Sequence, residues 1–219
     1  MVLVCGIEEA GRGPVIGPLI MVGLAMEKRH LEKLKALGVK DSKQLTIKQI
    51  QILKEQILKI PNKHIILRIQ PKEIDDAVDG NNSLNLNWLE ARKTAELLNQ
   101  LNPNTAYIDC PSPNINAYKS YIRRLLKNKE IELIPEHKAD IKYPIVSASS
   151  IIAKCIREEE VAKIEKIVKQ SIGSGYPSNP ICQKFLKENH DKYPQFVRHS
   201  WASYKNIIKE KHQKSLGEY

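Results

Sequence analysis

The 219-residue sequence predicts an α/β fold, in which helices pack on the faces of a central, partly parallel sheet. Short apolar segments typical of strands alternate with longer segments that have helical periodicity. A hydrophobic content of 42% and a charged content of 27% are typical of a globular domain, and we find neither an internal repeat nor a linker. We therefore expect one domain over residues 1–172 and a helical extension over residues 173–219.

The first two strands are expected over residues 2–7 and 19–26, because both segments are short and apolar and the first is rich in β-branched residues. Thr46 and Gln49 have the spacing of a capping box, and apolar residues recur behind them at helical intervals. The same criteria predict strands over 64–69, 105–109 and 130–134, and helices over 86–101, 115–126 and 144–169. These strands and helices complete a five-stranded sheet with flanking helices.

The charge of the chain indicates a polyanionic partner. With 35 Lys and Arg residues against 25 Asp and Glu residues, the formal net charge is +10 and the isoelectric point is near 9.3. A basic surface around clustered acids fits a nucleic acid, although a solvated basic surface with no partner is the alternative. No apolar stretch approaches the roughly 18 residues that span a bilayer, and no signal peptide is recognised. These observations predict a cytoplasmic protein.

The four cysteines are Cys5, Cys110, Cys155 and Cys182. Their spacing contains no Cys-x-x-Cys pair and does not fit a zinc site. We expect reduced, mostly buried thiols, with a bridge between Cys5 and Cys110 as the alternative.

Two adjacent acids, Glu8 and Glu9, end the first strand and are followed by Gly11-Arg12-Gly13. Adjacent carboxylates repel each other unless a cation lies between them. Glycines allow the backbone of a polyanion to approach the chain closely. The combination predicts a metal-dependent enzyme that acts on phosphate esters, against the alternative of a polar strand end with a glycine turn.

Two further acids lie where they could join this site. Asp109 ends the expected strand over 105–109, and Asp140 follows the expected strand over 130–134. In open α/β sheets, ligands gather beyond the carboxyl ends of parallel strands. If the strands ending in Glu8 and Asp109 are neighbours, their side chains face one another. The alternative is that each acid is a solvated loop residue.

Four segments of the chain resemble, in order, the motifs of type 2 ribonucleases H (ribonuclease HII) in an archaeal-like form. They are residues 6–18, 107–109, 136–154 and 173–178. The resemblance implies a ribonuclease H-like fold with a C-terminal helical extension that contributes to substrate binding. It also implies an endonuclease that hydrolyses the RNA strand of RNA/DNA hybrids and cuts 5′ to ribonucleotides embedded in DNA. Type 3 ribonucleases H, junction resolvases and a catalytically weak hybrid-binding protein are the alternatives.

By this resemblance, two divalent cations, Mg²⁺ or Mn²⁺, are held by four catalytic acids, which are Glu8, Glu9, Asp109 and Asp140. The family usually has Asp where this sequence has Glu8. The additional methylene moves the carboxylate outward, so we expect either an altered metal spacing or a backbone that has shifted to compensate.

The resemblance also implies how the substrate is bound. Backbone groups of Gly11, Arg12 and Gly13 would contact the ribose hydroxyl that distinguishes RNA from DNA. Tyr176 would pack on the sugar at the RNA-to-DNA step, although an aromatic residue in a tight turn is the alternative. Three lysines are candidate phosphate contacts: Lys43, Lys138 and Lys154. The family often has Asp where this chain has Asn179.

The C-terminal tail resembles the peptide that binds sliding clamps (the PCNA-interacting box). Gln213, Leu216 and Tyr219 have the three-residue spacing of its anchors, which insert into a groove as one helical turn. The alternative is an accidental match in a basic terminus. We expect the protein to be a monomer.

Overall fold

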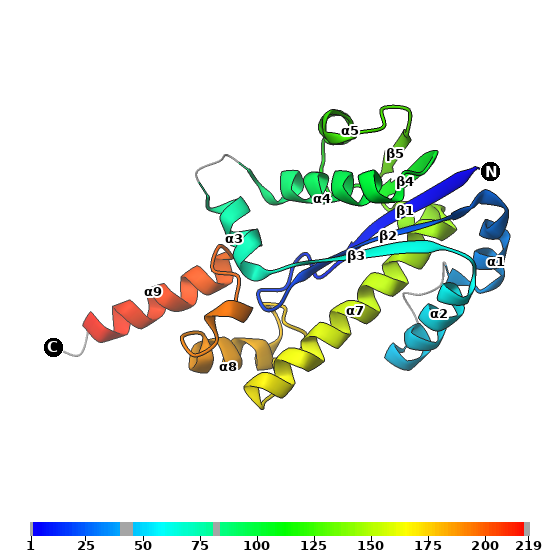
Figure 1. The fold of residues 1–219 in the computed structure, drawn as a ribbon. Coiled ribbons are helices and arrows are strands. Elements are labelled where there is room, and N and C mark those ends of the chain that lie inside the picture. Colours follow the sequence, from blue (N-terminus) through cyan, green and yellow to red (C-terminus); the bar gives the residue numbers. More distant parts are fainter. Residues whose placement is uncertain (1, 40–45, 81–83, 217–219) are drawn as a thin grey trace. The chain divides into compact units, whose positions relative to one another are not determined.

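A computed structural model describes residues 2–39, 46–80 and 84–216, with side chains described through residue 209 (Figure 1). The strands are β1 (Leu3–Ala10), β2 (Leu19–Glu27), β3 (Lys63–Ile69), β4 (Thr105–Asp109) and β5 (Glu132–Glu136). The α-helices are α1 (Leu31–Ala36), α2 (Ile47–Lys59), α3 (Pro71–Val78), α4 (Leu86–Leu101), α5 (Ile115–Leu125), α6 (Ala139–Lys142), α7 (Pro144–Val168), α8 (Pro180–Asn189) and α9 (Ala202–Leu216). Short 3₁₀ helices η1 (Lys28–His30) and η3 (Pro194–Phe196) follow β2 and α8.

The chain divides into two compact units. The first contains residues 1–10, 20–68 and 87–156, and the second contains residues 11–19, 69–86 and 157–219. The expected helical extension lies within the second unit. The domain boundary at residue 172 stays a prediction.

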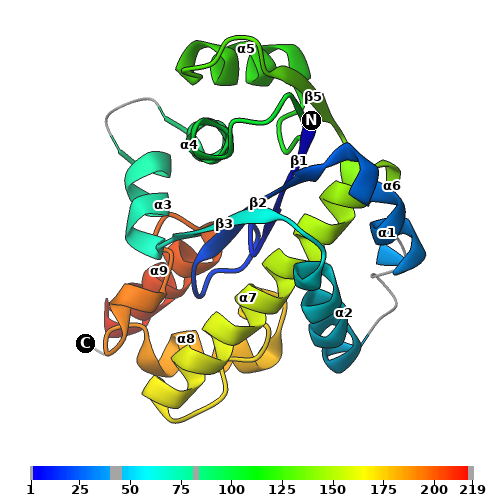
Figure 2. The same ribbon diagram turned by 45° about the vertical axis from the view of Figure 1, so that its right-hand side comes forward.

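The sheet has the strand order β3-β2-β1-β4-β5. Strand β1 pairs antiparallel with β2 and parallel with β4, and β4 pairs parallel with β5. This confirms the five-stranded mixed sheet and the hairpin between the first two strands. In the first unit, α4 and α5 cover one face of the sheet, and α1, α2 and the N-terminal part of α7 cover the other (Figure 2).

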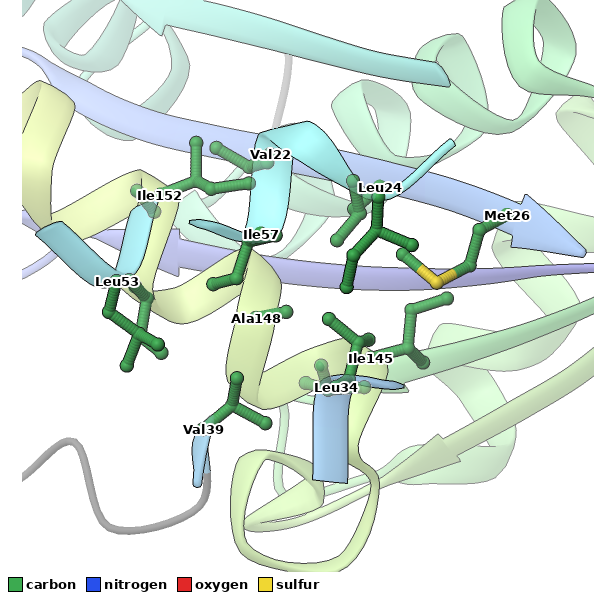
Figure 3. Close-up of a cluster of buried hydrophobic side chains, with 14 of the residues drawn as sticks. Val22, Leu24, Met26, Leu34, Val39, Leu53, Ile57, Ile145, Ala148 and Ile152 are labelled. Atoms are coloured by element: carbon green, nitrogen blue, oxygen red, sulfur yellow. The ribbon is translucent and has the colours of Figure 1, made fainter. Parts of the chain in front are cut away.

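The core of the first unit lies between the sheet and α1, α2 and α7 (Figure 3). Helix α7 lies directly on β1, because Gly6 has no side chain: a Cβ atom there would be 2.4 Å from the carbonyl oxygen of Ile145. The Ser149 hydroxyl donates to the Gly6 carbonyl at 2.9 Å. This close contact fixes the strand that carries Glu8. Helix α2 begins with the expected capping box of Thr46 and Gln49.

Strand β5 lies two residues further along the chain than the sequence predicted. The Asn128 side chain accepts from the Glu130 amide at 3.0 Å, so residue 130 belongs to a turn. Pairing with β4 begins only at Glu132, whose amide donates to the Asn104 carbonyl at 2.9 Å. Pro135 is tolerated in the strand because the backbone nitrogen at its position points away from β4. The missing N–H group of proline therefore costs no hydrogen bond to β4.

Two further expectations concern thiols and membranes. All four cysteines are buried and free, so Cys5 and Cys110 are not bridged.

None of the helices in the described ranges has both the length and the apolar character needed to cross a membrane.

The core of the second unit is formed by the C-terminal part of α7, helix α8 and the segments around Ile16 and Val197, which pair as an isolated bridge. Helix α8 is capped by Asn179, whose side chain accepts from the amides of Ile181 and Cys182 at 3.0 and 3.1 Å. Asn and Asp serve equally well as N-caps, which explains why either residue fits this position.

Candidate active site

Glu8 and Asp109 lie side by side at the carboxyl ends of β1 and β4. The parallel register pairs Ile7 with Ile108, and the acids are the next residues on each strand. Residues paired in a parallel ladder point to the same face of the sheet. The expected juxtaposition of these two carboxylates follows from this register.

Asp140 is brought to the same place by the turn after β5. Lys138 adopts a left-handed conformation with φ 56°, which turns the chain into α6. The Ala139 amide then donates to Asp109 Oδ1 at 3.0 Å, and the Ser147 hydroxyl donates to the Asp140 carbonyl. These contacts tie α6 to both β4 and α7.

Glu8 is at the centre of this acidic group, and the residue is only 9% exposed. Burial raises its pKa well above the usual range, and the negative charge of Asp109 raises it further, as does that of Asp140. The Glu9 amide, which donates to the Glu8 carboxylate, lowers this pKa, and Lys154 has a smaller effect in the same direction. These charges leave an excess of negative charge around the poorly solvated Glu8 carboxyl group.

Glu9 points to the opposite face of the sheet from Glu8, because successive strand residues alternate. Its charge acts on that face, where it contributes to raising the pKa values of the Cys110 thiol and of the Tyr118 phenol, both of which are raised mainly by burial. The structure therefore brings three of the predicted acids together and sets Glu9 beside them at the strand end.

Oxygen ligands and excess negative charge both suit a divalent cation such as Mg²⁺ or Mn²⁺. In the described part of the chain, no three His, Cys, Asp or Glu side chains are already arranged to hold an ion. One oxygen of Asp109 and one of Glu8 are turned to backbone amides instead. Binding of a cation by all these acids therefore requires rotation of side chains, while the charge that attracts it is already in place.

The raised pKa of Glu8 predicts how stability depends on pH and metal. Glu8 binds its proton more tightly in the folded state than in the unfolded state. Its stabilising contribution to the free energy of unfolding is therefore complete below the pKa of the unfolded state, and it is lost as the pH rises through the pKa of the folded state. In EDTA at pH 8 we expect Glu8→Gln to raise the unfolding midpoint by about 2–4 °C. At pH 4 the gain should vanish, and at pH 8 Mn²⁺ should stabilise the wild type more than the variant. A pH-independent difference between the two proteins would contradict this account.

The second unit contains the Gly11-Arg12-Gly13 loop. Gly11 has φ 83°, and a Cβ atom there would lie 2.8 Å from the Arg157 side chain. A Cβ atom on Gly13 would lie 3.0 Å from the Tyr176 ring. Gly11 is thus required by its backbone conformation and by close packing, and Gly13 leaves room for the ring of Tyr176, which is 46% exposed and lies against the loop.

Two residues that the sequence analysis missed hold this loop. The fully buried Arg198 donates to the carbonyl oxygens of Gly11, Arg12 and Gly17 at 2.6, 2.8 and 3.0 Å. Trp201 Nε1 donates to the Gly13 carbonyl at 3.1 Å, and the Arg198 guanidinium lies 4.9 Å from its ring centroid.

Because three consecutive carbonyls point to Arg198 and Trp201, the amides on the other side of the same planar peptide groups point away from them. These are the N–H groups of Arg12 and Gly13. They form a pair of adjacent donors suited to a hydroxyl or phosphate oxygen.

Arg157 is a second buried cation beside the loop. It is 5% exposed and donates to the carbonyls of Ile16 and Ser174 at 3.1 and 3.5 Å. Burial lowers the pKa of its guanidinium from the ordinary arginine value. Arginine nevertheless keeps its charge in proteins. It therefore adds a positive charge near backbone that is expected to meet a polyanion.

The remaining predicted residues are dispersed. Lys154 acts electrostatically on Glu8, and Lys138 is exposed at the start of α6. Lys43 lies outside the described residues, as does Tyr219. The backbone positions of Gln213 and Leu216 belong to α9, but their side chains lie outside the described part.

Comparison with known proteins gives a consistent result. Residues 5–204 match the family model described as Ribonuclease HII. A ribonuclease HII of Pyrococcus furiosus is 43% identical over 207 residues, covering 92% of this chain and 89% of the relative.

Solved structures agree with this match. The ribonuclease H2 of Pyrococcus horikoshii OT3 superimposes with a TM-score of 0.86 at 39% identity, covering 95% of this chain and 98% of that one. A ribonuclease HII of Archaeoglobus fulgidus, solved in complex with PCNA, gives a TM-score of 0.81 at 34% identity, covering 93% and 96%.

Proposed function

Because this chain belongs to the ribonuclease HII family of endonucleases that degrade the RNA strand of RNA/DNA hybrids, we propose that four carboxylates carry that activity as ligands of two divalent cations. They are Glu8, Glu9, Asp109 and Asp140. The observation that carries the proposal is the buried Glu8 carboxyl, whose pKa two neighbouring acids raise further. Two divalent cations held by these residues would supply an activated water for attack on the scissile phosphate and stabilisation of the departing 3′ oxygen, and the product would carry a 5′-phosphate.

The side chains have separate tasks in this proposal. Asp109 is oriented by the Ala139 amide, which fixes the position of one of its carboxylate oxygens. Asp140 is held in position because its main-chain carbonyl accepts a hydrogen bond from the Ser147 hydroxyl. Lys154 balances part of the charge on Glu8 and suits a phosphate of the substrate.

Recognition of the ribose is proposed to rest on the amides of Arg12 and Gly13. A pair of donors can bind the 2′-oxygen or the adjacent phosphate, and the 2′-hydroxyl is the group that DNA lacks. Tyr176 offers an exposed ring beside Gly13 on which a sugar can pack. These features support cleavage 5′ to a single ribonucleotide embedded in DNA.

The Tyr176→Ala variant tests this part of the proposal. We expect kcat at a single embedded ribonucleotide to fall by about 100-fold, because a sugar displaced by about 1 Å is poorly aligned for reaction. The dissociation constant for the same duplex should change by less than about fivefold. Single-turnover cleavage and fluorescence anisotropy measure the two quantities, and Tyr193→Ala serves as a control for loss of an aromatic ring elsewhere in the second unit. An unchanged kcat with weakened binding would reduce Tyr176 to a binding residue.

We also propose weak, micromolar binding of a sliding clamp through Gln213, Leu216 and Tyr219. The Archaeoglobus fulgidus relative was solved in complex with PCNA, and binding to a clamp would raise the local concentration of the nuclease on DNA. Titration of the clamp from the same organism should show binding to the full chain and none to a truncation after Lys211. The Lys214→Ala variant should bind like the full chain. Equal affinity of the full and truncated chains, or none for either, would end the proposal.

A further inference from the structure

Helix α3 carries an acid that holds the segment between η3 and α9, and all of these elements belong to the second unit (Figure 2). One carboxylate oxygen of Asp75 accepts from the His199 amide at 2.9 Å, and the other accepts from the Ser200 amide, also at 2.9 Å. The Ser200 hydroxyl donates to this second oxygen at 2.5 Å. Three donors from two consecutive residues therefore converge on one carboxylate, which lies 124 residues before His199 in the chain.

The residues on either side of this pair are the ones that support the Gly11-Arg12-Gly13 loop. Arg198 comes directly before the pair, and its guanidinium donates to the first two carbonyls of the loop. Trp201 comes directly after the pair, and its indole N–H donates to the third. Since each residue has only two soft backbone dihedrals, fixing the two central amides restricts where the flanking side chains begin. The loop is thus supported by two side chains whose own main chain is held by an acid on α3.

The contact at Asp75 requires a carboxylate. An ionised carboxylate has acceptors only, so both of its oxygens can face N–H groups. Asparagine has the same size, but its NH₂ group would face one of the two backbone amides, and that amide would lose its partner. Hydrogen bonds to a charged acceptor are also roughly twice as strong as neutral ones. Asp75→Asn therefore removes part of the support without changing the size of the side chain.

A second acid of α3 makes a different contact with the same region. Asp79 lies one turn after Asp75, so the two acids share a face of the helix. Its carboxylate pairs with Lys205 of α9 at 2.8 Å, and both side chains are 48% exposed, so the pair is expected to contribute little to stability. The Asp79 contact reaches α9 beyond Trp201, whereas Asp75 binds the segment between Arg198 and Trp201. Asp79 is therefore a matched control for Asp75.

We propose that Asp75 is a positioning residue for the recognition of RNA, which acts on the Gly11-Arg12-Gly13 loop through Arg198 and Trp201. The inference rests on the proposed function, in which the loop amides bind the ribose hydroxyl or the adjacent phosphate. If the segment shifts, the loop carbonyls lose their donors, the peptide planes turn, and the amides on their other side are no longer aligned. Asp75 acts at a distance, because both of its oxygens are turned to the backbone of the segment.

The test measures the preference of the full-length protein for an RNA/DNA hybrid over an all-DNA duplex, by competitive binding in EDTA. Asp75→Asn should lower this preference about tenfold, whereas Asp79→Asn should change it less than about twofold. All proteins are compared at a temperature where circular dichroism shows them folded. A wild-type preference that Asp75→Asn leaves unchanged would overturn the role of Asp75 alone. Equal binding of the two duplexes by the wild type would overturn the recognition role of the loop, and the role of Asp75 with it.

A double-mutant cycle tests whether Asp75 acts through the two side chains that hold the loop. In a protein that already carries Arg198→Lys and Trp201→Phe, adding Asp75→Asn should lower the preference by less than about twofold more, because the contacts that it positions are already lost. A further tenfold loss in this background would show that Asp75 acts by another route and would overturn the proposal. A lower unfolding midpoint of Asp75→Asn with an unchanged preference would also overturn it, because Asp75 would then only stabilise the second unit.

Discussion

Asp109→Asn is expected to lower the rate of hybrid cleavage at saturating substrate by about three orders of magnitude, which corresponds to about 4 kcal/mol of transition-state stabilisation. An amide is a poor ligand for Mg²⁺ and carries no charge, so the cations lose a main ligand. The Asn oxygen can still accept from the Ala139 amide, so the turn into α6 should be preserved. The dissociation constant for the hybrid, measured in EDTA, should change by less than about threefold, because the acids act in the chemical step.

Glu9→Gln should behave in the same way, although Glu9 lies on the other side of β1 from Glu8. Asp76→Asn is the matched control, because it makes the same chemical change at an exposed acid of α3 that pairs with Lys72 at the surface. Its cleavage rate should equal that of the wild type. Near-normal turnover in both Asp109→Asn and Glu9→Gln would contradict the assignment of these acids as metal ligands.

The pairing of Glu8 with Asp109 could be predicted because it depends on strand order alone. Both acids end strands, and neighbouring parallel strands bring their carboxyl ends together. The conformation of the side chains could not be predicted in the same way. Whether a carboxylate turns to a backbone amide or to another acid depends on local turns, such as the left-handed Lys138, that leave no clear pattern in the sequence.

The scaffold of the glycine loop was missed for a different reason. Arg198 lies 186 residues from Arg12, and a lone arginine in a polar segment is usually solvated. The only sequence signal was its position between the apolar Val197 and Trp201. Its burial results from long-range packing within the second unit, which periodicity and motif spacing do not report.

Arg198→Lys is expected to remove hydrogen bonds that hold the Gly11-Arg12-Gly13 loop in position. Lysine keeps the positive charge, but its single nitrogen cannot reach three separate carbonyls as the guanidinium does. The loop should then shift, and with it the amides of Arg12 and Gly13. We expect kcat/KM for the hybrid to fall about 100-fold and the preference for the hybrid over an all-DNA duplex in binding to decrease. Trp201→Phe removes the bond to Gly13 and reduces the ring on which the Arg198 guanidinium lies, and it should lower kcat/KM about tenfold.

A purely structural role of Arg198 would lower the unfolding midpoint and the amount of active enzyme, yet leave the preference for RNA unchanged in the molecules that fold. The preference is therefore the decisive measurement, made by competition between the hybrid and an all-DNA duplex at a temperature where circular dichroism shows both proteins folded. Arg92→Lys, the same replacement at an exposed site on α4, should leave kcat/KM and the preference at wild-type values. If Arg198→Lys does the same, the loop does not need its buried support, and recognition of the ribose must depend on other groups.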